Sequence, residues 1–114
     1  MMADNIFQKI IDRQIKADIV YEDDRCLAFR DINPQAPTHV LIIPRKVIAT
    51  HDAVTEADRD VLGHLHVVAA QLAKKFGLAD GYRLVINCRE RAGQTVPHLH
   101  LHLLGGRDFH WPPG

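Results

Sequence analysis

The sequence predicts a single α+β domain, residues 1–114, in which a mostly antiparallel sheet of about five strands packs against one short and one long helix. Two observations predict this class. Apolar residues recur at helical spacing near the start and in the middle of the chain, and short runs rich in β-branched and aromatic residues lie between and after these stretches. A chain of this length forms one domain with a modest core.

Both helices are predicted from their apolar stripes and capping residues. Residues 4–14 carry apolar side chains three and four positions apart, and either Asp4 or Asn5 can cap the first turn. The long helix begins after Thr55, which together with Asp58 approximates a capping box. Its apolar stripe consists of Val61, Leu62, Leu65, Val68, Ala69, Leu72 and Phe76.

Five segments have the composition and the boundaries of strands. They are residues 19–22, 26–30, 39–43, 82–88 and 98–104. Asp23 and Asp24 form the turn between the first two strands, and Pro44 ends the third because it lacks a backbone donor. The sequence contains no internal repeat and no linker, which supports one continuous domain.

Composition and charge exclude several classes of protein. Fourteen Lys and Arg residues balance fourteen Asp and Glu residues, so no net field attracts the chain to nucleic acid or to a membrane. No apolar run approaches the roughly 18 residues of a membrane span, and the N-terminus does not resemble a signal peptide. Cys26 and Cys88 form neither a disulfide framework nor a spaced metal motif. We therefore expect a cytoplasmic protein with no nucleic-acid or membrane partner.

The strongest functional signal is a run in which His98, His100 and His102 alternate with leucines. In a strand, residues two apart share a face, so the histidines lie on one side and the leucines on the other. We expect the leucines to face the core. The histidines are expected to face a cleft or solvent, because each imidazole has a donor and an acceptor that need partners.

A metal site and ordinary structural histidines are the alternatives to a catalytic site. Zinc prefers about four ligands, whereas His98 and His102 stand roughly 13 Å apart along an extended strand. Neither a Cys-x-x-Cys pair nor a carboxylate pair lies nearby to complete a shell, so no metal or other cofactor is expected. His64 and His66 are also two apart, but on a helix this spacing places them on opposite faces, as solvated or packing residues.

Catalysis at phosphorus uses all three histidines of the run. An unprotonated imidazole nitrogen can attack phosphorus when the other ring nitrogen is held by a hydrogen bond. Flanking imidazoles, when protonated, can stabilise charge on the phosphate oxygens, and a neighbouring acid can protonate the leaving group. The chain has no P-loop glycine motif, so phosphate would be bound in another way.

The run His98-Leu99-His100-Leu101-His102-Leu103-Leu104 resembles the signature of the histidine triad (HIT) superfamily of nucleotide hydrolases and transferases. The similarity extends over nearly the whole chain and is greatest to the Hint branch of that superfamily. It is carried by residues 23–29, 31–32, 34–39, 43–44, 93–96, 105–107 and 110–114. The resemblance implies a HIT-like fold.

The resemblance also implies the catalytic roles. His100 matches the nucleophile that takes the nucleoside monophosphate as a covalent intermediate. His98 and His102 would position it and support the phosphate and the leaving group, and His39 matches a fourth active-site histidine. Asp31 matches a carboxylate that accepts hydrogen bonds from the ribose hydroxyls, a task that suits an acceptor-only group.

Further residues are assigned to nucleotide binding by the same resemblance. Asn87 and Thr95 would donate hydrogen bonds around the α-phosphate and the leaving group. The base pocket would be lined by Ile6, Phe7, Ile10, Phe29, Ile32 and Leu41. Thr95 and Pro97 replace a common serine and a common tyrosine of the Hint branch, and these departures bear on the preference for a leaving group.

The leading hypothesis is a purine nucleoside phosphoramidase that hydrolyses adenosine 5′-monophosphoramidate or an aminoacyl-adenylate and releases AMP. One alternative is a dinucleoside polyphosphate hydrolase of the same superfamily. Another is a non-catalytic zinc-binding or scaffold protein. The resemblance further implies a homodimer in which Trp111 reaches toward the active site of the partner chain.

Overall fold

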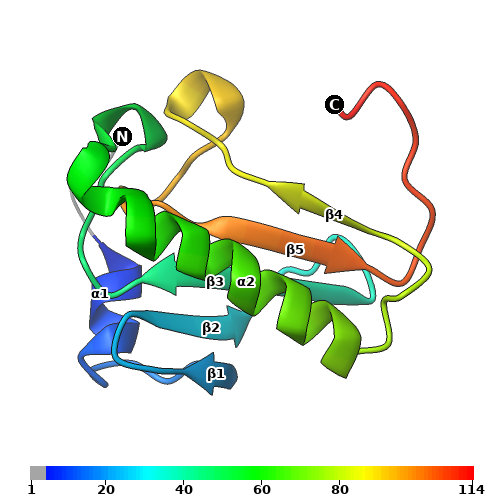
Figure 1. Cartoon of the computed structure of the whole chain (residues 1–114), viewed down its shortest axis with the longest axis horizontal. Coiled ribbons are helices and arrows are strands. Elements are labelled where there is room, and N and C mark those ends of the chain that lie inside the picture. Colours follow the sequence, from blue (N-terminus) through cyan, green and yellow to red (C-terminus); the bar gives the residue numbers. More distant parts are fainter. Residues whose placement is uncertain (1–4) are drawn as a thin grey trace.

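A computed structural model describes residues 5–114 of the chain. Its strands are β1 (Ile19–Glu22), β2 (Cys26–Arg30), β3 (Thr38–Pro44), β4 (Tyr82–Val85) and β5 (Leu101–Gly105), and its α-helices are α1 (Ile6–Ile11) and α2 (Arg59–Lys75). The strands form one sheet in the order β1-β2-β3-β5-β4, and every neighbouring pair is antiparallel (Figure 1). The predicted α+β class is confirmed.

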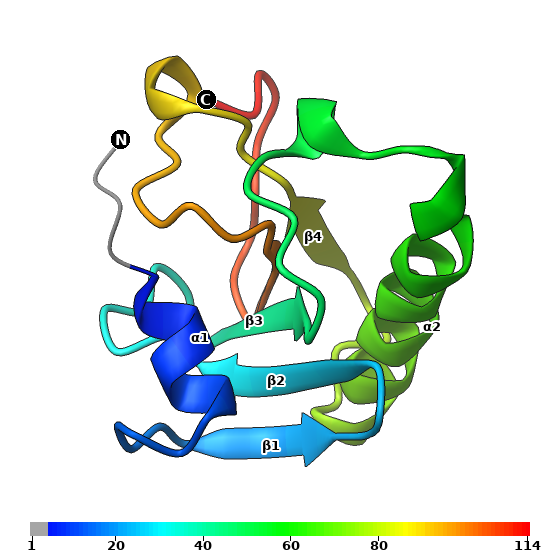
Figure 2. The ribbon, with the colours of Figure 1, turned by 90° about the vertical axis from the view of Figure 1, so that its left-hand side faces the viewer.

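The two α-helices lie on opposite faces of the sheet (Figure 2). Because successive side chains of a strand alternate between faces, each strand contributes to two cores. The α2 face is closed by residues that include Ala28, Val40 and Ile42, and the α1 face by residues that include Phe29 and Leu41. No helix among residues 5–114 has the length and apolar composition that crossing a membrane requires.

Helix α1 is shorter than the predicted 4–14 segment. Asn5 caps it, since its side-chain oxygen accepts a hydrogen bond from the backbone N–H of Gln8 at 3.1 Å. The predicted alternative cap, Asp4, lies outside the described residues. The helix ends at Ile11 because the chain turns at Arg13, whose φ of 61° is not helical.

Helix α2 follows the sequence-based prediction more closely. A 3₁₀ turn, Glu56–Asp58, precedes it. The expected capping box is present: the Thr55 hydroxyl accepts from the N–H of Ala57, and the Asp58 carboxylate accepts from the N–H of Thr55. The predicted apolar stripe is buried or packed against the core on the sheet: Val61, Leu62, Leu65, Val68, Ala69, Leu72 and Phe76.

The last two strands are shorter than the predicted 82–88 and 98–104 segments. β4 ends at Val85, and β5 begins only at Leu101. The chain before β5 leaves the hydrogen-bond ladder with β3 because its backbone groups have other partners. The backbone N–H of Leu99 donates to the carbonyl of Ile48, and the side chain of His98 donates to the carbonyl of Pro44. Side-chain competition therefore shortens the strand.

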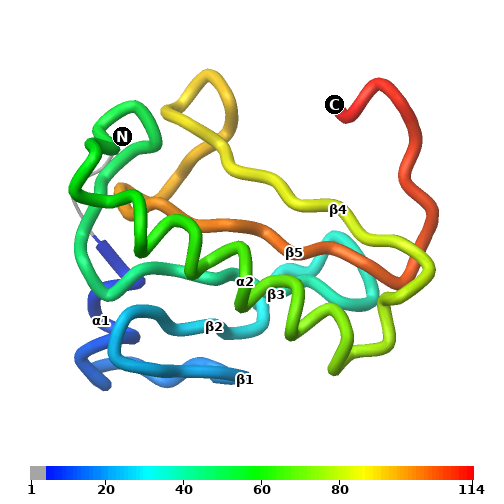
Figure 3. Tube along the Cα trace, in the orientation of Figure 1, coloured from blue at the N-terminus to red at the C-terminus, as the bar shows by residue number. Residues whose placement is uncertain are grey.

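The C-terminal tail leaves the end of β5 and passes the start of β4 (Figure 3). The Arg83 guanidinium donates to the carbonyl of His110 at 2.9 Å. The guanidinium groups of Arg83 and Arg107 lie over the ring of Phe109, at 5.0 and 4.2 Å from its centroid. These contacts hold the tail against the sheet and leave Trp111 exposed at its end.

Candidate active site

The three histidines of the alternating run lie in β5 and in the segment that leads into it. As predicted, the leucines between them are buried in the core under α2. The histidines face the other side of the sheet, where the ring of His100 meets that of Phe7 edge-on with centroids 5.0 Å apart. Strand β3 lies beside β5 and pairs Leu41 with His102. The active-site side of the sheet is therefore the α1 side.

The expectation that all three histidines face a cleft or solvent is wrong for His98, which is fully buried. Its Nε2 donates to the carbonyl of Pro44 at 2.7 Å, and its Nδ1 accepts from the side-chain amide of Asn5 at 3.0 Å. Because a carbonyl only accepts, these partners fix the ring as the Nε2–H tautomer. Both polar atoms are satisfied, so the ring can be buried at little cost.

His100 is held with one nitrogen available for chemistry. Its Nδ1 lies 2.7 Å from the carbonyl of His98, which requires a hydrogen on Nδ1. In the neutral ring, Nε2 then carries the lone pair. The structure gives Nε2 no hydrogen-bond partner among residues 5–114, and His100 lines the pocket described below. This arrangement suits a nucleophile.

A relay of hydrogen bonds fixes the tautomer of His102. The backbone N–H of Gln35 donates to Nδ1 of His39 at 3.1 Å, so His39 carries its hydrogen on Nε2. That Nε2 lies 2.9 Å from Nδ1 of His102 and donates to it. His102 therefore carries its own hydrogen on Nε2, which is buried and without a partner in the part of the chain that the structure describes. An unpaired buried donor is costly, and a phosphoryl oxygen would satisfy it.

Burial keeps these imidazoles neutral. Desolvation lowers the pKa of His98 and of His100. The hydrogen bonds to the carbonyl of Pro44 and to the carbonyl of His98, respectively, oppose this shift only in part. Desolvation, with the neighbouring His100 and His39, lowers the pKa of His102 to about 4. The expected protonated flanking imidazoles are thus absent from the free protein near neutral pH. His102 can still stabilise an oxyanion as a neutral N–H donor.

An apolar pocket of about 360 Å³ opens beside His100 and His102. Its walls come from α1, the segment after α1, β2, β3 and the loop before the triad. The predicted site residues that line it are Ile6, Phe7, Ile10, Phe29, Asp31, Ile32, Leu41, Asn87, Thr95, His100 and His102. His39 and His98 stand behind this lining. Trp111 does not belong to it and is 85 % exposed.

Asp31 and Ile32 stand where the pocket meets solvent. The Asp31 carboxylate uses one oxygen to accept from the backbone N–H of Asn33 at 2.8 Å. Its other oxygen lies 3.6 Å from Nε2 of His39, and the Asp31 side chain is partly exposed. Ile32 is 99 % exposed, an unusual state for a large apolar side chain. The pocket therefore combines an apolar surface with an available carboxylate oxygen.

Two supporting residues were not predicted from the sequence. Asn5 both caps α1 and holds Nδ1 of His98, so it connects the helix to the triad. Gln94 is buried and ties the loop before the triad together: its oxygen accepts from the N–H of Arg89, and its amide donates to the carbonyls of Ala49 and Val96. A glutamine in a polar loop gives no sequence signal of such burial.

Asp31, His39 and His102 bring three possible metal ligands within 4.8 Å of one another. The relay from Gln35 through His39 to His102 already uses the facing nitrogens, in a hydrogen bond of 2.9 Å. In this structure His39 and His102 therefore form a hydrogen-bonded pair that the backbone of Gln35 orients.

Acid is expected to destabilise the fold through these histidines. The unfolded chain has ordinary histidine pKa values of about 6.5, whereas the folded values are lower, about 4 for His102. As pH falls from about 6.5 toward 4, the unfolded state binds more protons, so the free energy of unfolding decreases; above this window it is unaffected. Urea unfolding at about pH 7.5 and about pH 5 tests this. Equal stabilities at the two pH values would contradict this expected loss of stability in acid. The control is His66→Gln, a substitution of an exposed histidine, which should leave the pH dependence of stability as in the wild type.

Fold and site together define a small α+β protein whose neutral, oriented histidines border a pocket. Comparison with known proteins gives its family: residues 12–109 match the HIT domain. The chain therefore belongs to the HIT domain family.

Several relatives match over almost their full length. A HIT-like protein of Synechocystis, described as uncharacterized, is 58% identical over 114 residues and covers all of both chains. A 14 kDa zinc-binding protein of Zea mays is 52% identical over 111 residues, which are 96% of this chain and 87% of the maize protein.

Solved structures show the same fold. The crystal structure of a HIT family hydrolase from Legionella pneumophila has a TM-score of 0.95 and 52% identity, covering 97% of this chain and 100% of that one. A histidine triad nucleotide-binding protein from Candida albicans has a TM-score of 0.82 and 31% identity, covering 96% of this chain and 83% of that one. The chain is thus a hydrolase-like protein of the HIT family.

Proposed function

We propose that this protein is a purine nucleoside phosphoramidase of the Hint type, which hydrolyses adenosine 5′-phosphoramidates or aminoacyl-adenylates and releases AMP. The observation that carries the proposal is the orientation of His100. The carbonyl of His98 holds the hydrogen on Nδ1, so Nε2 offers a lone pair beside the pocket. The names of the HIT family hydrolase and of the histidine triad nucleotide-binding protein support nucleotide hydrolysis.

The proposed reaction has two displacements at the α-phosphorus. Nε2 of His100 attacks, a bond forms between this nitrogen and phosphorus, and the bond from phosphorus to the leaving amine breaks as the amine takes up a proton from solvent. A water molecule then attacks phosphorus and releases a proton to solvent, and the bond from phosphorus to Nε2 of His100 breaks. In both steps the Nε2–H of His102 donates to a phosphoryl oxygen, which supplies the partner that this buried donor lacks.

The remainder of the nucleotide fits the pocket. The purine would pack against the apolar side chains of α1 and β3 and cover Ile32, which is exposed in the free protein. The free oxygen of Asp31 would accept hydrogen bonds from the ribose hydroxyls. Asn87 and Thr95 line the other side, where they would donate to the α-phosphate and the leaving group.

Turnover of a fluorogenic adenosine phosphoramidate tests this activity, with diadenosine triphosphate as the second substrate. We expect the phosphoramidate to have the higher kcat/KM. The reverse order would favour the second enzymatic candidate, a dinucleoside polyphosphate hydrolase. Hydrolysis of neither substrate would contradict both.

Substitution of Asp31 tests the placement of the ribose. We expect Asp31→Ala to lower kcat/KM for the ribonucleotide substrate about 10-fold or more, because two charge-assisted hydrogen bonds are lost. The wild type should also discriminate against the 2′-deoxy substrate, and the variant should not. An Asp31→Ala protein that retained the full discrimination would show that Asp31 does not contact the sugar.

Zinc binding without catalysis is the remaining candidate, and the name of the maize relative favours it. The two candidates differ in turnover and in metal content. If the protein is a phosphoramidase that acts through His100, chelator-treated protein retains its turnover. If it binds zinc without catalysis, protein purified without chelator contains near-stoichiometric zinc and shows no turnover with or without the metal.

We also propose a homodimer formed through the β4 edge of the sheet. β4 pairs with β5 on one side only, and an exposed strand edge can pair with a second copy. Tyr82 on β4, Val67 on α2 and Trp111 in the C-terminal tail are exposed. Light scattering should give twice the chain mass of 12.9 kDa. A monomer at micromolar concentration would contradict the proposal and the role of Trp111 at a partner's site.

A further inference from the structure

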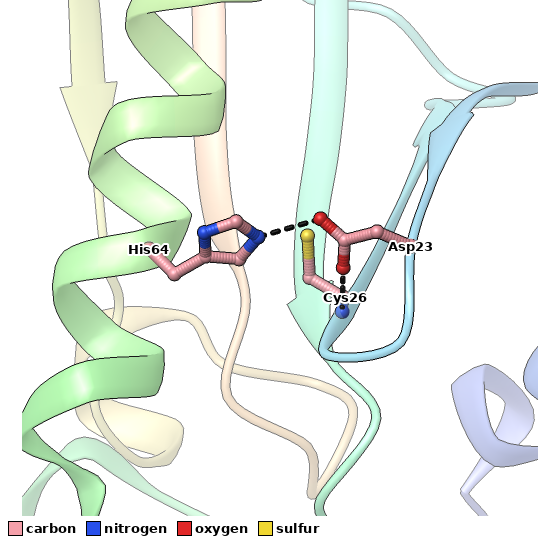
Figure 4. Close-up of side chains that lie close together, drawn as sticks. All are labelled: Asp23, Cys26 and His64. Carbon is pink, nitrogen blue, oxygen red and sulfur yellow. Dashed lines mark hydrogen bonds and ion pairs between the residues drawn. The ribbon is translucent and has the colours of Figure 1, made fainter.

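We propose that Asp23, Cys26 and His64 form a binding site for a divalent transition-metal ion of the Zn²⁺ type, separate from the histidine triad. The three side chains converge between α2 and the turn that joins β1 to β2 (Figure 4). Their ligand atoms all lie within 4.8 Å of one another. A thiolate, an imidazole nitrogen and a carboxylate oxygen are the three ligand types that zinc uses in proteins.

The burial of the three residues suits a site that is closed on one side. Cys26 is fully buried at the start of β2 and places its sulfur at the inner end of the cluster. The side chains of Asp23 and His64 are 22% and 24% exposed, so the outer end reaches solvent. An ion can enter from this end, and water can supply the fourth ligand.

Asp23 is oriented before any ion binds. One carboxylate oxygen accepts from the backbone N–H groups of Arg25 and Cys26, at 2.8 and 2.9 Å. This fixes the turn and directs the other oxygen toward His64, whose Nε2 lies 2.6 Å away. The Tyr21 hydroxyl donates to that same oxygen at 2.7 Å. Tyr21 can keep this bond to a metal-bound carboxylate and so hold the ligand in place.

Small movements convert the cluster into a tetrahedral site. Zinc bonds of roughly 2.0–2.3 Å place neighbouring ligand atoms roughly 3.3–3.6 Å apart. The imidazole nitrogen and the carboxylate oxygen must therefore separate from their present 2.6 Å. His64 can move because its ring lies on the partly exposed side of α2. The hydrogen on its Nε2 moves to Nδ1 or to solvent, and the thiol proton is released to solvent.

Asp23 and Cys26 lie three positions apart at the β1–β2 turn, with their ligand atoms within 4.8 Å of each other. A divalent ion between them would stabilise the carboxylate and the thiolate together.

The site is independent of the proposed hydrolysis. Cys26 belongs to the core under α2, whereas the pocket beside His100 lies on the α1 face of the sheet. None of the three ligands lines that pocket. A bound ion would tie the β1–β2 turn to α2, so its expected effect is on stability.

Titration of the full chain with Co²⁺ under a non-thiol reductant tests the site, because a cobalt–thiolate bond gives a charge-transfer absorption band that histidine ligands cannot produce. We expect one equivalent of Co²⁺ to give this band and Zn²⁺ to abolish it by competition. Cys26→Ser should lose the band, and His64→Gln should weaken binding at least about 10-fold. Cys88→Ser and the neighbouring, exposed His66→Gln are the matched controls and should bind as the wild type does.

Thermal unfolding provides a second readout that does not require substitution of the buried cysteine. Zinc should raise the Tm of the wild type and of His66→Gln, but not that of His64→Gln. The proposal is overturned if the wild type gives no thiolate band. It is also overturned if Cys88→Ser removes the band, or if His64→Gln binds cobalt and gains stability from zinc as the wild type does.

Discussion

Replacement of His100 by alanine is expected to lower kcat for an adenosine phosphoramidate by at least about 10⁴-fold, since loss of a covalent nucleophile removes most of the rate enhancement. The physical reason is specific to this site. Nε2 of His100 is the ring nitrogen that the structure leaves as an acceptor beside the pocket, whereas His98 and His102 carry hydrogens on Nε2. Neither neighbour can replace it without breaking its own hydrogen bonds.

The matched control for this measurement is His66→Ala on the exposed side of α2. It should change kcat by no more than about twofold, as is usual for surface substitutions. Circular dichroism and thermal unfolding establish that the His100→Ala protein is folded. A folded His100→Ala protein with kcat within about 10-fold of the wild type would exclude His100 as the nucleophile.

Replacement of His98 by alanine is expected to have the largest effect on stability. The ring is fully buried, and its removal leaves a cavity, an unpaired carbonyl at Pro44 and an unpaired amide at Asn5. Together these cost about 3–5 kcal/mol of unfolding free energy. Urea unfolding near pH 7.5 measures this. Asn5→Ala removes only one partner and the α1 cap, so it should cost about 1–2 kcal/mol.

His98→Ala also separates a structural from a catalytic role of His98. His98 supports His100 through its backbone carbonyl and does not line the pocket. The alanine variant keeps this carbonyl, so it should lose stability while its kcat/KM falls less than that of His100→Ala. A His98→Ala protein that lost less than about 1 kcal/mol of stability would contradict the assignment of His98 as a buried supporting residue.

Local sequence patterns were sufficient to predict most of the fold. The stripe of α2 and its Thr55–Asp58 box were found because helical periodicity and capping are local properties. The start of β5 was not predicted correctly, because the strand begins only after the side chain of His98 has taken the carbonyl of Pro44. That contact joins residues 54 positions apart, and no local pattern reports it.

Resemblance to the HIT superfamily indicated residues, Ile32 and Asn87 among them, that line one pocket in the structure, and their roles in a reaction stay predictions. The electrostatics of the histidines were not predicted. Alternation alone suggested exposed, protonated flanking histidines. Burial instead makes His98 and His102 neutral. The hydrogen bonds that set their tautomers, from Asn5 to His98 and from the backbone of Gln35 through His39 to His102, are visible only in three dimensions. The cluster of Asp23, Cys26 and His64 was missed for the same reason.

The central claim is that His100 forms a covalent nucleotidyl intermediate, and the stereochemical course at the α-phosphorus tests it most directly. An adenosine phosphoramidate that is chiral at phosphorus through sulfur substitution can be hydrolysed in oxygen-labelled water, and the configuration of the product determined. Two displacements, the first by Nε2 of His100, predict net retention of configuration. Net inversion would mean that water attacks directly, and it would contradict the assignment of His100 as the nucleophile.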